Sequence, residues 1–181
     1  MAFFLLGFAV ILILVGGVYV IAQFLSLFTA APFVPSSAKR VAAMIAFAEI
    51  KPGEHVVDLG SGDGRLVLAA ARAGAEAEGW EANALLVWWS RMILRLSGAA
   101  AHATVHLGSY RGIDLRHADV VFLYVLPAEM ARLERWFPAA LHPGARVVVN
   151  AFPFPTWTPE EKRGTVYRYR VPTLFPPAPS L

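Results

Sequence analysis

Apolar and polar positions along this chain follow two regimes, which change near residue 39. Residues 2–38 carry no charged side chain, and their apolar run is longer than the roughly 20 residues that cross the hydrocarbon of a bilayer. Beyond residue 38, short apolar runs typical of buried strands alternate with longer segments of helical spacing. The pattern predicts one N-terminal transmembrane helix followed by a single α/β domain.

The predicted elements after residue 38 alternate between helix and strand. Ser36 or Ser37 caps a first helix that runs to about Glu49, and Lys51-Pro52-Gly53 ends it. Further helices are predicted at residues 64–73, 82–97 and from Pro127, and strands at residues 55–59, 75–81, 104–107, 119–124, 146–150 and 165–170. This alternation predicts a mostly parallel sheet with helices on both faces and right-handed crossovers.

Composition and pattern divide the chain into four segments. They are a transmembrane anchor at residues 1–31, a pre-domain segment and helix at 32–53, the α/β domain at 54–171 and a Pro-rich tail at 172–181. A cleaved signal peptide is the competing interpretation of the first segment, because Thr29-Ala30-Ala31 offers small residues. The absence of Lys or Arg before the apolar run, and the length of that run, favour the anchor.

The first charges after the apolar run indicate an orientation. Lys39 and Arg40 favour a cytoplasmic position for the C-terminal side by the positive-inside tendency. A mitochondrial transit peptide would be Arg-rich and amphipathic, and this segment is neither. We therefore expect a single-pass protein of the inner (cytoplasmic) membrane whose catalytic domain lies on the cytoplasmic side.

The most informative motif lies where the first strand of the domain ends. Residues 55–66 read His-Val-Val-Asp-Leu-Gly-Ser-Gly-Asp-Gly-Arg-Leu, which is typical of a strand, a tight turn and a helix start. Glycines at such a turn permit positive φ and let a ligand approach the backbone, while N–H groups at the helix start supply donors. The spacing Gly-x-Gly-x-Gly differs from the dinucleotide pattern Gly-x-Gly-x-x-Gly. We expect a nucleotide-like ligand here.

An acidic residue ends the second predicted strand, 21 residues after Gly60. The carboxylate of Glu81 suits the vicinal hydroxyls of a ribose, because it can accept two hydrogen bonds. A glycine turn that merely caps a helix is the alternative for the turn alone. The strand, the turn with its own Asp58 and the downstream acid together favour a ribose-containing ligand.

These residues resemble the class I S-adenosylmethionine-dependent methyltransferases, whose first motif ends in Asp-x-Gly-x-Gly-x-Gly. Further segments resemble one subfamily, the mitochondrial lysine methyltransferases that modify the adenine nucleotide translocase and the c-ring protein of ATP synthase, together with their prokaryotic relatives. The segments that carry the resemblance are residues 32–37, 58–65, 122–127 and 152–157. The resemblance covers most of residues 32–171. It implies a Rossmann-like, mostly parallel seven-stranded sheet that binds S-adenosyl-L-methionine.

The resemblance also implies which residues hold that cofactor. The methionine end is assigned to Asp58, Gly60, Gly62 and Gly64, the ribose hydroxyls to Glu81, and the adenine edge to Ser109 and Tyr110, with Ser36 closing the site from the N-terminal side. Ser109 departs from the common methyltransferase pattern, in which an acid often bonds the adenine amine. Ala151 likewise stands where many prokaryotic relatives carry an Asp.

Ligands of parallel sheets sit beyond the carboxyl ends of the strands. That rule places residues 58–64, 81–83, 108–110 and 123–124 around one crevice. It adds to the candidate cofactor-binding residues Ser61, Asp63, Ala82, Asn83 and Leu123. For Asp63 two interpretations stand, since its carboxylate either contacts the ligand or only caps the helix that follows.

Two aromatic residues are candidates for the catalytic part of the site. Tyr124 ends the fourth predicted strand and either faces the substrate or bonds a local partner. Trp157, between Pro155 and Pro159, either walls a substrate channel or covers the sheet. Methyl transfer to lysine needs alignment and a neutral amine more than covalent catalysis. Aromatic walls that lower the pKa of the lysine are expected from Tyr110, Phe122, Tyr124, Phe154 and Trp157.

Charge and composition limit the alternatives. The 16 basic and 13 acidic residues give a formal charge of +3 without a run of four basic residues, so nucleic-acid binding is not indicated. There is no cysteine, and the five histidines lack metal-ligand spacing; no metal is expected. The segment Trp88-Trp89-Ser90-Arg91 with Arg95 either faces lipid headgroups or, as is commoner for such aromatics, belongs to the core.

We therefore expect a membrane-anchored protein-lysine N-methyltransferase that acts on lysines of membrane proteins near the bilayer surface. Tethering gives such an enzyme a high effective concentration at its substrate. One alternative is a methyltransferase of a lipid or quinone-like small molecule, and another is a non-catalytic membrane scaffold that binds the cofactor. A nicotinamide dehydrogenase fits the glycine spacing less well.

Overall fold

The computed structural model describes residues 2–26 and 37–172. The chain divides into two compact units, Met1–Val34 and Pro35–Leu181, and each is considered by itself. Ser36, which the sequence assigns to the cofactor site, lies outside the described residues, as does the Pro-rich tail after Pro172.

The first unit contains one helix, α1 (Ala2–Ser26). It has no acidic residue in its first turn and no basic residue in its last. Large apolar side chains on it are exposed, among them Phe8 and Ile13. In the part of the chain that the structure describes, no helix combines the length and apolar character required to cross a membrane. The transmembrane helix predicted within residues 1–31 is therefore not supported, although a helix forms there.

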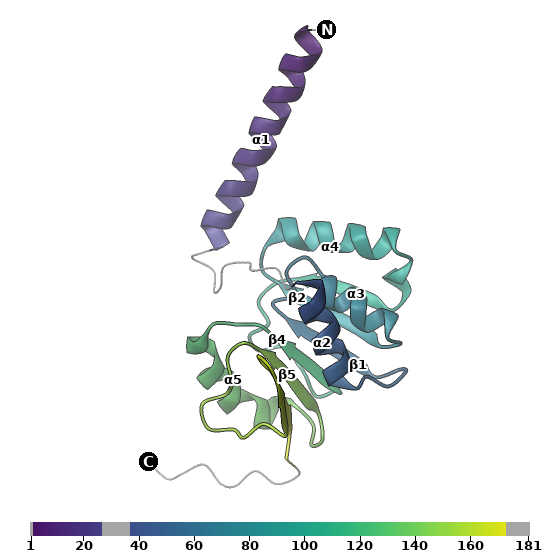
Figure 1. The fold of residues 1–181 in the computed structure, drawn as a ribbon, viewed down its shortest axis with the longest axis vertical. Coiled ribbons are helices and arrows are strands. Elements are labelled where there is room, and N and C mark those ends of the chain that lie inside the picture. Colours follow the sequence, from purple (N-terminus) through teal and green to yellow (C-terminus); the bar gives the residue numbers. More distant parts are fainter. Residues whose placement is uncertain (1, 27–36, 173–181) are drawn as a thin grey trace. The chain divides into compact units, whose positions relative to one another are not determined.

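The second unit is built on a seven-stranded sheet with the order β3-β2-β1-β4-β5-β7-β6 (Figure 1). The strands are β1 (His55–Leu59), β2 (Glu76–Glu81), β3 (Ala103–Leu107), β4 (Val120–Leu123), β5 (Arg146–Asn150), β6 (Glu161–Arg163) and β7 (Val166–Arg170). The pairs among β1 to β5 are parallel, while β7 runs antiparallel to both β5 and β6. This confirms the predicted seven-stranded, mostly parallel sheet. The short strand β6 was not among the segments that the sequence pattern identified.

Four α-helices of the second unit begin at the signals that the sequence supplies. They are α2 (Ala38–Ala48), α3 (Arg65–Arg72), α4 (Ala84–Leu96) and α5 (Pro127–Ala140), with a short 3-10 helix at Ala99–Ala101. The Ser37 side chain accepts a hydrogen bond from the backbone N–H of Arg40, and Asn83 caps α4 in the same way. Pro127 occupies the first turn of α5, where its missing N–H costs no hydrogen bond.

Alternate residues of the parallel strands feed two apolar layers. Val56 and Phe122 pack in the layer beneath α2, α3 and α4, whereas Val57 and Leu123 pack in the layer beneath α5. Both faces of the sheet are thus covered, as the alternation of helix and strand predicted (Figure 1). The carboxyl ends of β1, β2, β3, β4 and β5 share one edge, and the polar candidate residues of the sequence gather there.

Candidate active site

The glycine turn is fixed to the neighbouring strand β2 by backbone hydrogen bonds. Gly60 N and Ser61 N both donate to Trp80 O, at 2.9 and 3.1 Å. Gly60, Gly62 and Gly64 have φ of 86°, 56° and 76°, a region that glycine reaches without steric cost. A Cβ added at Gly60 would meet no atom within 4 Å. The turn therefore presents a bare backbone to open space at the carboxyl edge of the sheet.

Helix α4 supports the turn from its other side. The Ser90 hydroxyl donates to Gly62 O at 3.1 Å and to Leu86 O at 2.7 Å. A Cβ on Gly64 would lie 2.8 Å from the Ser90 Cβ, so glycine is required there for packing as well as for φ. Sequence reasoning assigned Ser90 no role at this turn, because its position in an apolar helix conceals one.

Ser61 is placed differently from a ligand-facing residue. Its side chain is buried over β2, because a Cβ added at Gly79 would come within 2.6 Å of the Ser61 Cβ and Oγ. Within the described residues, the Ser61 hydroxyl has no hydrogen-bond partner. Its side chain packs against the strand, and its backbone N–H already donates to Trp80.

Glu81 bridges the glycine turn and the start of α4. Its Oε2 accepts from Gly62 N at 2.9 Å and its Oε1 from Asn83 N at 2.7 Å. An ionised carboxylate has about four acceptor sites, so roughly two stay open after these bonds. Both oxygens are thereby held in place with acceptor capacity left for a vicinal diol. Ala82, between Glu81 and Asn83, is exposed at the same edge.

A second carboxyl group lies beneath the turn. Asp58 is 6% exposed, and burial, followed by the charges of Glu81 and Asp63, raises its pKa to about 8. Asp63 pairs with the Arg65 side chain, whose Nε donates at 2.8 Å. The N-cap of α3 is Gly64, without a side-chain hydrogen bond. The site accordingly concentrates negative charge around a carboxyl group that is buried.

The carboxyl ends of β3 and β4 bring further candidates to this edge. Ser109 is exposed, and its Oγ accepts from Arg111 N at 3.1 Å. Tyr110 is half-buried, its hydroxyl donates to a carboxylate oxygen of Glu129 at 3.5 Å, and burial together with Glu129 raises its pKa. The side chain of Leu123 is fully buried in the core, so only its backbone borders the edge. Tyr124 follows it and is half-buried.

Trp157 lies in an aromatic cluster on the face that α5 covers. Its ring stacks on Phe154 at 5.2 Å between centroids and lies 5.3 Å from Tyr169. Tyr169 pairs in register with Val147, near the amino end of β5. Trp157 N also donates to Glu134 of α5. The structure thus brings Trp157 to the covering position that the sequence left as one of two possibilities.

The expectation that five aromatic residues wall one channel is wrong for Phe122. That side chain is fully buried in the layer beneath α2, α3 and α4, whereas Phe154 belongs to the layer beneath α5. Successive side chains of a strand point to opposite faces, which is why a motif read along β4 does not gather on one wall. Tyr110 and Tyr124 remain as the aromatic candidates next to the carboxyl ends of β3 and β4.

Two buried polar groups at this edge were missed by the sequence reasoning. Asn150 ends β5 and is fully buried, and its Oδ1 accepts from the Thr165 hydroxyl at 3.4 Å. Its Nδ2 and the Nε1 of Trp80 have no hydrogen-bond partner among the described residues. Unpaired buried donors are costly, and both follow the rule that polar groups at the carboxyl ends of parallel strands are candidates for binding.

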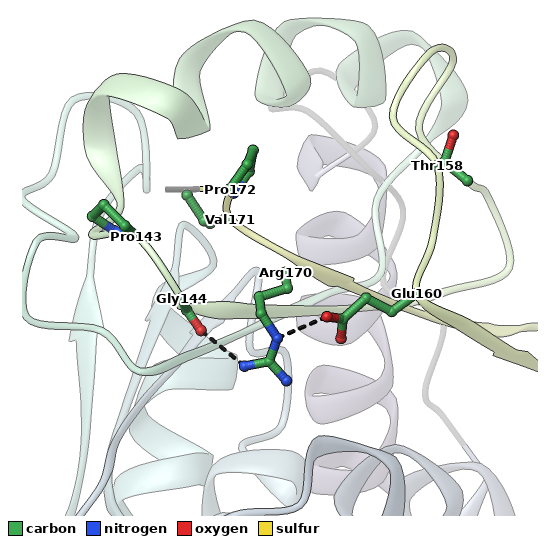
Figure 2. Close-up of a pocket in the computed structure, with 7 residues that line it drawn as sticks. All are labelled: Pro143, Gly144, Thr158, Glu160, Arg170, Val171 and Pro172. Atoms are coloured by element: carbon green, nitrogen blue, oxygen red, sulfur yellow. Dashed lines mark hydrogen bonds and ion pairs between the residues drawn. The ribbon is translucent and has the colours of Figure 1, made fainter. Parts of the chain in front are cut away.

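A surface hollow of about 320 Å³ lies away from these residues (Figure 2). Gly144 and Arg170 line it, and they flank the amino end of β5. The Arg170 guanidinium there donates to Glu160 at 2.7 Å and to Gly144 O at 3.3 Å. None of its lining residues belongs to the glycine turn or its neighbours. Among the described residues, moreover, no group of three His, Cys, Asp or Glu side chains could hold a metal ion.

The seven-stranded sheet and the glycine turn with its acid partners define the fold and site of a class I methyltransferase. Comparison with known proteins gives the family directly, because the ANTKMT methyltransferase domain matches residues 58–161. The chain belongs to this family.

Two curated relatives illustrate the similarity. The lysine N-methyltransferase of the ATP synthase c-ring protein from Rattus norvegicus is 37% identical over 142 residues, covering 76% of this chain and 65% of the relative. The adenine nucleotide translocase lysine N-methyltransferase of Mus musculus is 39% identical over 129 residues, covering 71% and 56%. This chain therefore spans less than two thirds of the length of either relative.

A solved structure extends the comparison to three dimensions. It is an RNA methyltransferase from Salinibacter ruber in complex with S-adenosyl-L-homocysteine, with a TM-score of 0.78 and 33% sequence identity. The similarity covers 82% of this chain and all of the other. The fold is thus shared with a protein that binds a product of methyl transfer.

Proposed function

We propose that this chain is an S-adenosylmethionine-dependent protein-lysine N-methyltransferase. The observation that carries the proposal is the placement of Glu81, which ends β2 with its carboxylate held by Gly62 N and Asn83 N beside an open glycine turn. Membership of the ANTKMT family and the lysine methyltransferase activity named for two relatives support the same substrate class.

The residues present fit the cofactor by charge and by hydrogen bonding. Burial and two neighbouring carboxylates disfavour ionisation of Asp58, so a cation bound at the turn would relieve an unfavourable concentration of negative charge. S-adenosylmethionine carries an ammonium and a sulfonium, and the methyl group on its sulfonium is what passes to an amine. Asp58 and the glycine turn would hold the methionine end, and the open acceptor sites of Glu81 the ribose hydroxyls.

The rest of the reaction demands little from the protein. A lysine with an ordinary pKa of about 10.4 must lose its proton before it can attack, and a partly desolvated position beside a cation favours the neutral amine. Tyr124 and Tyr110 are half-buried after β4 and β3, where they would flank the incoming side chain. The proton leaves to solvent, and the chain has only to align the amine with the methyl group.

We further propose that α1 attaches the enzyme to a membrane and that the target lysines lie near the bilayer surface. The uncharged sequence of residues 2–38 and the exposed apolar side chains of α1 support attachment. The inner (cytoplasmic) membrane, with the catalytic domain on its cytoplasmic side, is the proposed location, because Lys39 and Arg40 are the first charges to follow. Relatives named for the c-ring protein of ATP synthase and for the adenine nucleotide translocase suggest substrates that are membrane proteins.

The test is methyl transfer by the detergent-purified full chain. We expect transfer of labelled methyl groups from S-adenosylmethionine to protein in membrane extracts, recovered as ε-N-methyllysine after digestion and mass spectrometry. The matched control is Glu81→Ala, which should be inactive. Label recovered only in lipid would favour a lipid methyltransferase, and cofactor binding without any transfer would favour a scaffold.

RNA methylation is a second candidate, favoured by the name of the Salinibacter ruber protein. Several arginines that could bind phosphate are already paired with carboxylates, including Arg146 with Glu54 and Arg168 with Glu161, and this weighs against an RNA surface. The same assay separates the candidates, because label in nucleosides from added RNA, and not in lysine, would replace the lysine proposal.

A further inference from the structure

Helix α4 carries an apolar stripe on its solvent side. The stripe consists of Leu85, Trp88, Trp89, Met92 and Leu96, which recur at helical spacing along one face. Trp88 is 63% exposed, Trp89 46% and Leu96 78%, while Met92 is half-buried. Such aromatics are usually core, and the structure shows that these are not.

The opposite face of α4 accounts for this exposure. Val87, Ser90 and Leu94 are buried against the sheet and the glycine turn, and on a helix of 3.6 residues per turn they lie on the far side from the stripe. The helix is already docked through these residues. The stripe is therefore a second apolar face, of the kind that marks an interaction surface.

The charges beside the stripe have one sign. Arg91 and Arg95 are the ionisable residues of α4, which has no acid, and both are exposed. Arg91 donates from Nε to Val105 O at 2.8 Å, which holds its side chain along the helix. An apolar face rich in Trp and Leu, flanked by arginine, is the pattern of helices that lie in a membrane interface.

Other exposed apolar residues lie at the carboxyl edge of the sheet. Leu107 ends β3, Leu126 precedes α5 and Phe152 follows β5, with exposures of 55%, 42% and 37%. Helix α4 itself starts at this edge, directly after Asn83. The exposed apolar residues of the described domain are thus concentrated on α4 and around the mouth of the candidate site.

We propose that the stripe of α4 docks on an anionic phospholipid surface and turns the mouth of the active site toward the bilayer. The inference rests on the proposed function, in which the chain is attached to a membrane. Trp88 and Trp89 enter the interfacial region, where indole rings are favoured, and Arg95 meets lipid phosphate. Charge complementarity favours lipid over an apolar protein groove, since two cations without a compensating acid border the stripe.

The docked orientation has a consequence for specificity. Because Ser90 of α4 bonds the glycine turn directly, a helix fixed at the interface fixes the cofactor site at the same depth. Lysines that lie at the headgroup level then reach the site, and lysines far from the bilayer do not. A tether alone would leave the orientation of the domain free.

The experiment uses the full chain reconstituted into vesicles of phosphatidylcholine and phosphatidylglycerol. Co-sedimentation with the vesicles reports membrane attachment. Quenching of tryptophan emission by lipids brominated near the headgroup reports the position of α4. We expect the intact chain to sediment and to be quenched, and the double variant Trp88→Ser/Trp89→Ser to sediment with most of that quenching lost. Trp136→Phe on α5 is the control and should retain the quenching.

Charge provides a second arm. Arg95→Gln should weaken quenching in vesicles that contain phosphatidylglycerol and change little in pure phosphatidylcholine. Circular dichroism and cofactor binding check that each variant is folded.

The outcomes separate the two proposals. A chain that sediments but keeps its quenching in the double variant, or whose Trp88 and Trp89 stay as accessible to soluble iodide as in detergent, overturns the docking of α4 and leaves attachment standing. An equal effect of Arg95→Gln in both lipids overturns the anionic preference. A chain that does not sediment removes both proposals.

Discussion

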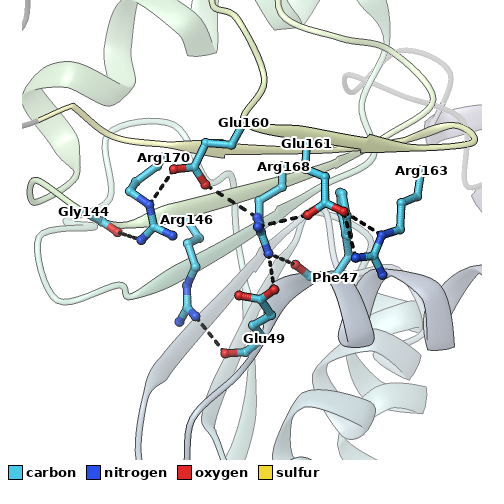
Figure 3. A network of polar contacts seen from close by, with 9 residues as sticks. All are labelled: Phe47, Glu49, Gly144, Arg146, Glu160, Glu161, Arg163, Arg168 and Arg170. Carbon is cyan, nitrogen blue, oxygen red and sulfur yellow. Dashed lines mark hydrogen bonds and ion pairs between the residues drawn. The ribbon is translucent and has the colours of Figure 1, made fainter.

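Two charged regions of this domain differ in how their charges are balanced. At the carboxyl edge, Asp58 is buried near Glu81 and Asp63, and its pKa is raised to about 8. Where β7 meets α2, Arg168 is 11% exposed and lies among three carboxylates, with Glu49 at 2.7 Å and Glu161 at 3.1 Å. Figure 3 shows these side chains converging from the strands and from the end of α2.

The second region is balanced in detail. Arg168 also donates to Phe47 O at 3.2 Å, and its guanidinium lies 5.3 Å from the Phe47 ring centroid. Arg146 donates to Glu49 O at 2.8 Å and pairs with Glu54. The pKa of Glu49 is lowered, mainly by Arg168. These contacts tie the end of α2 to strands β5 and β7.

The contrast teaches where a ligand is needed. The pKa of Asp58 rises because burial and like charges oppose its ionisation, whereas the pKa of Glu49 falls because arginine favours it. A site whose charge is left unbalanced by the protein is suited to a cationic ligand, and a site that is balanced contributes to folding. The two regions should therefore respond differently to mutation and to pH.

The largest effect is expected from Glu81→Ala. The substitution removes a charged acceptor that also fixes Gly62 N and Asn83 N, so affinity for S-adenosylmethionine should fall on the order of 100-fold, given the usual strength of two charge-assisted hydrogen bonds. Calorimetry measures the loss. Glu160→Ala in the balanced region is the control and should leave the affinity unchanged; a loss of similar size there would remove the distinction between the regions.

The next effect is on stability, from Arg168→Ala. The variant leaves three carboxylates without their shared cation and removes the contact with Phe47, and we expect a loss of about 2–3 kcal/mol in the free energy of unfolding. Urea denaturation measures it. Arg116→Ala, which breaks an exposed pair with Asp114, should leave the midpoint nearly unchanged, and cofactor affinity should be retained in both variants.

A smaller loss is expected at the glycine turn, from Gly64→Ala. The positive φ of 76° and the approach to Ser90 together should cost about 2 kcal/mol. Gly53→Ala is matched in φ, at 82°, but a Cβ there meets no atom within 4 Å, so only the backbone cost of about 1 kcal/mol remains. Equal losses by urea denaturation would show that α4 does not restrict the turn.

The smallest effect is a pH dependence set by Asp58. Between its ordinary pKa near 3.8 and about 8, the folded chain holds a proton that the unfolded chain releases, so the stability of the ligand-free protein should fall as pH rises through this window. Asp58→Asn should flatten that slope in thermal unfolding. Cofactor affinity should change oppositely and rise toward pH 8, because a bound cation favours the ionised carboxylate. A slope that Asp58→Asn leaves intact would assign it elsewhere.

The balanced region shows what local pattern fails to reveal. The sequence predicted the helix that ends at Glu49 and the strand that carries Arg168, but not that they meet. Strand β6, with its alternating charges at residues 161–163, has no apolar run to announce it, and forms because β7 offers it an antiparallel edge.

Local sequence determined the strands β1 to β5, the helix caps at Ser37 and Asn83, and the glycine turn with Glu81, because apolar period, capping side chains and glycine φ act over a few residues. Only the tertiary structure decided that Trp88 and Trp89 face solvent, that Phe122 and Phe154 part to opposite faces, and that Asn150 lies buried beside the site. An apolar helix such as α4 has more than one face that could be buried. Which face packs against the sheet depends on contacts between residues far apart in the chain, and no local pattern contains them.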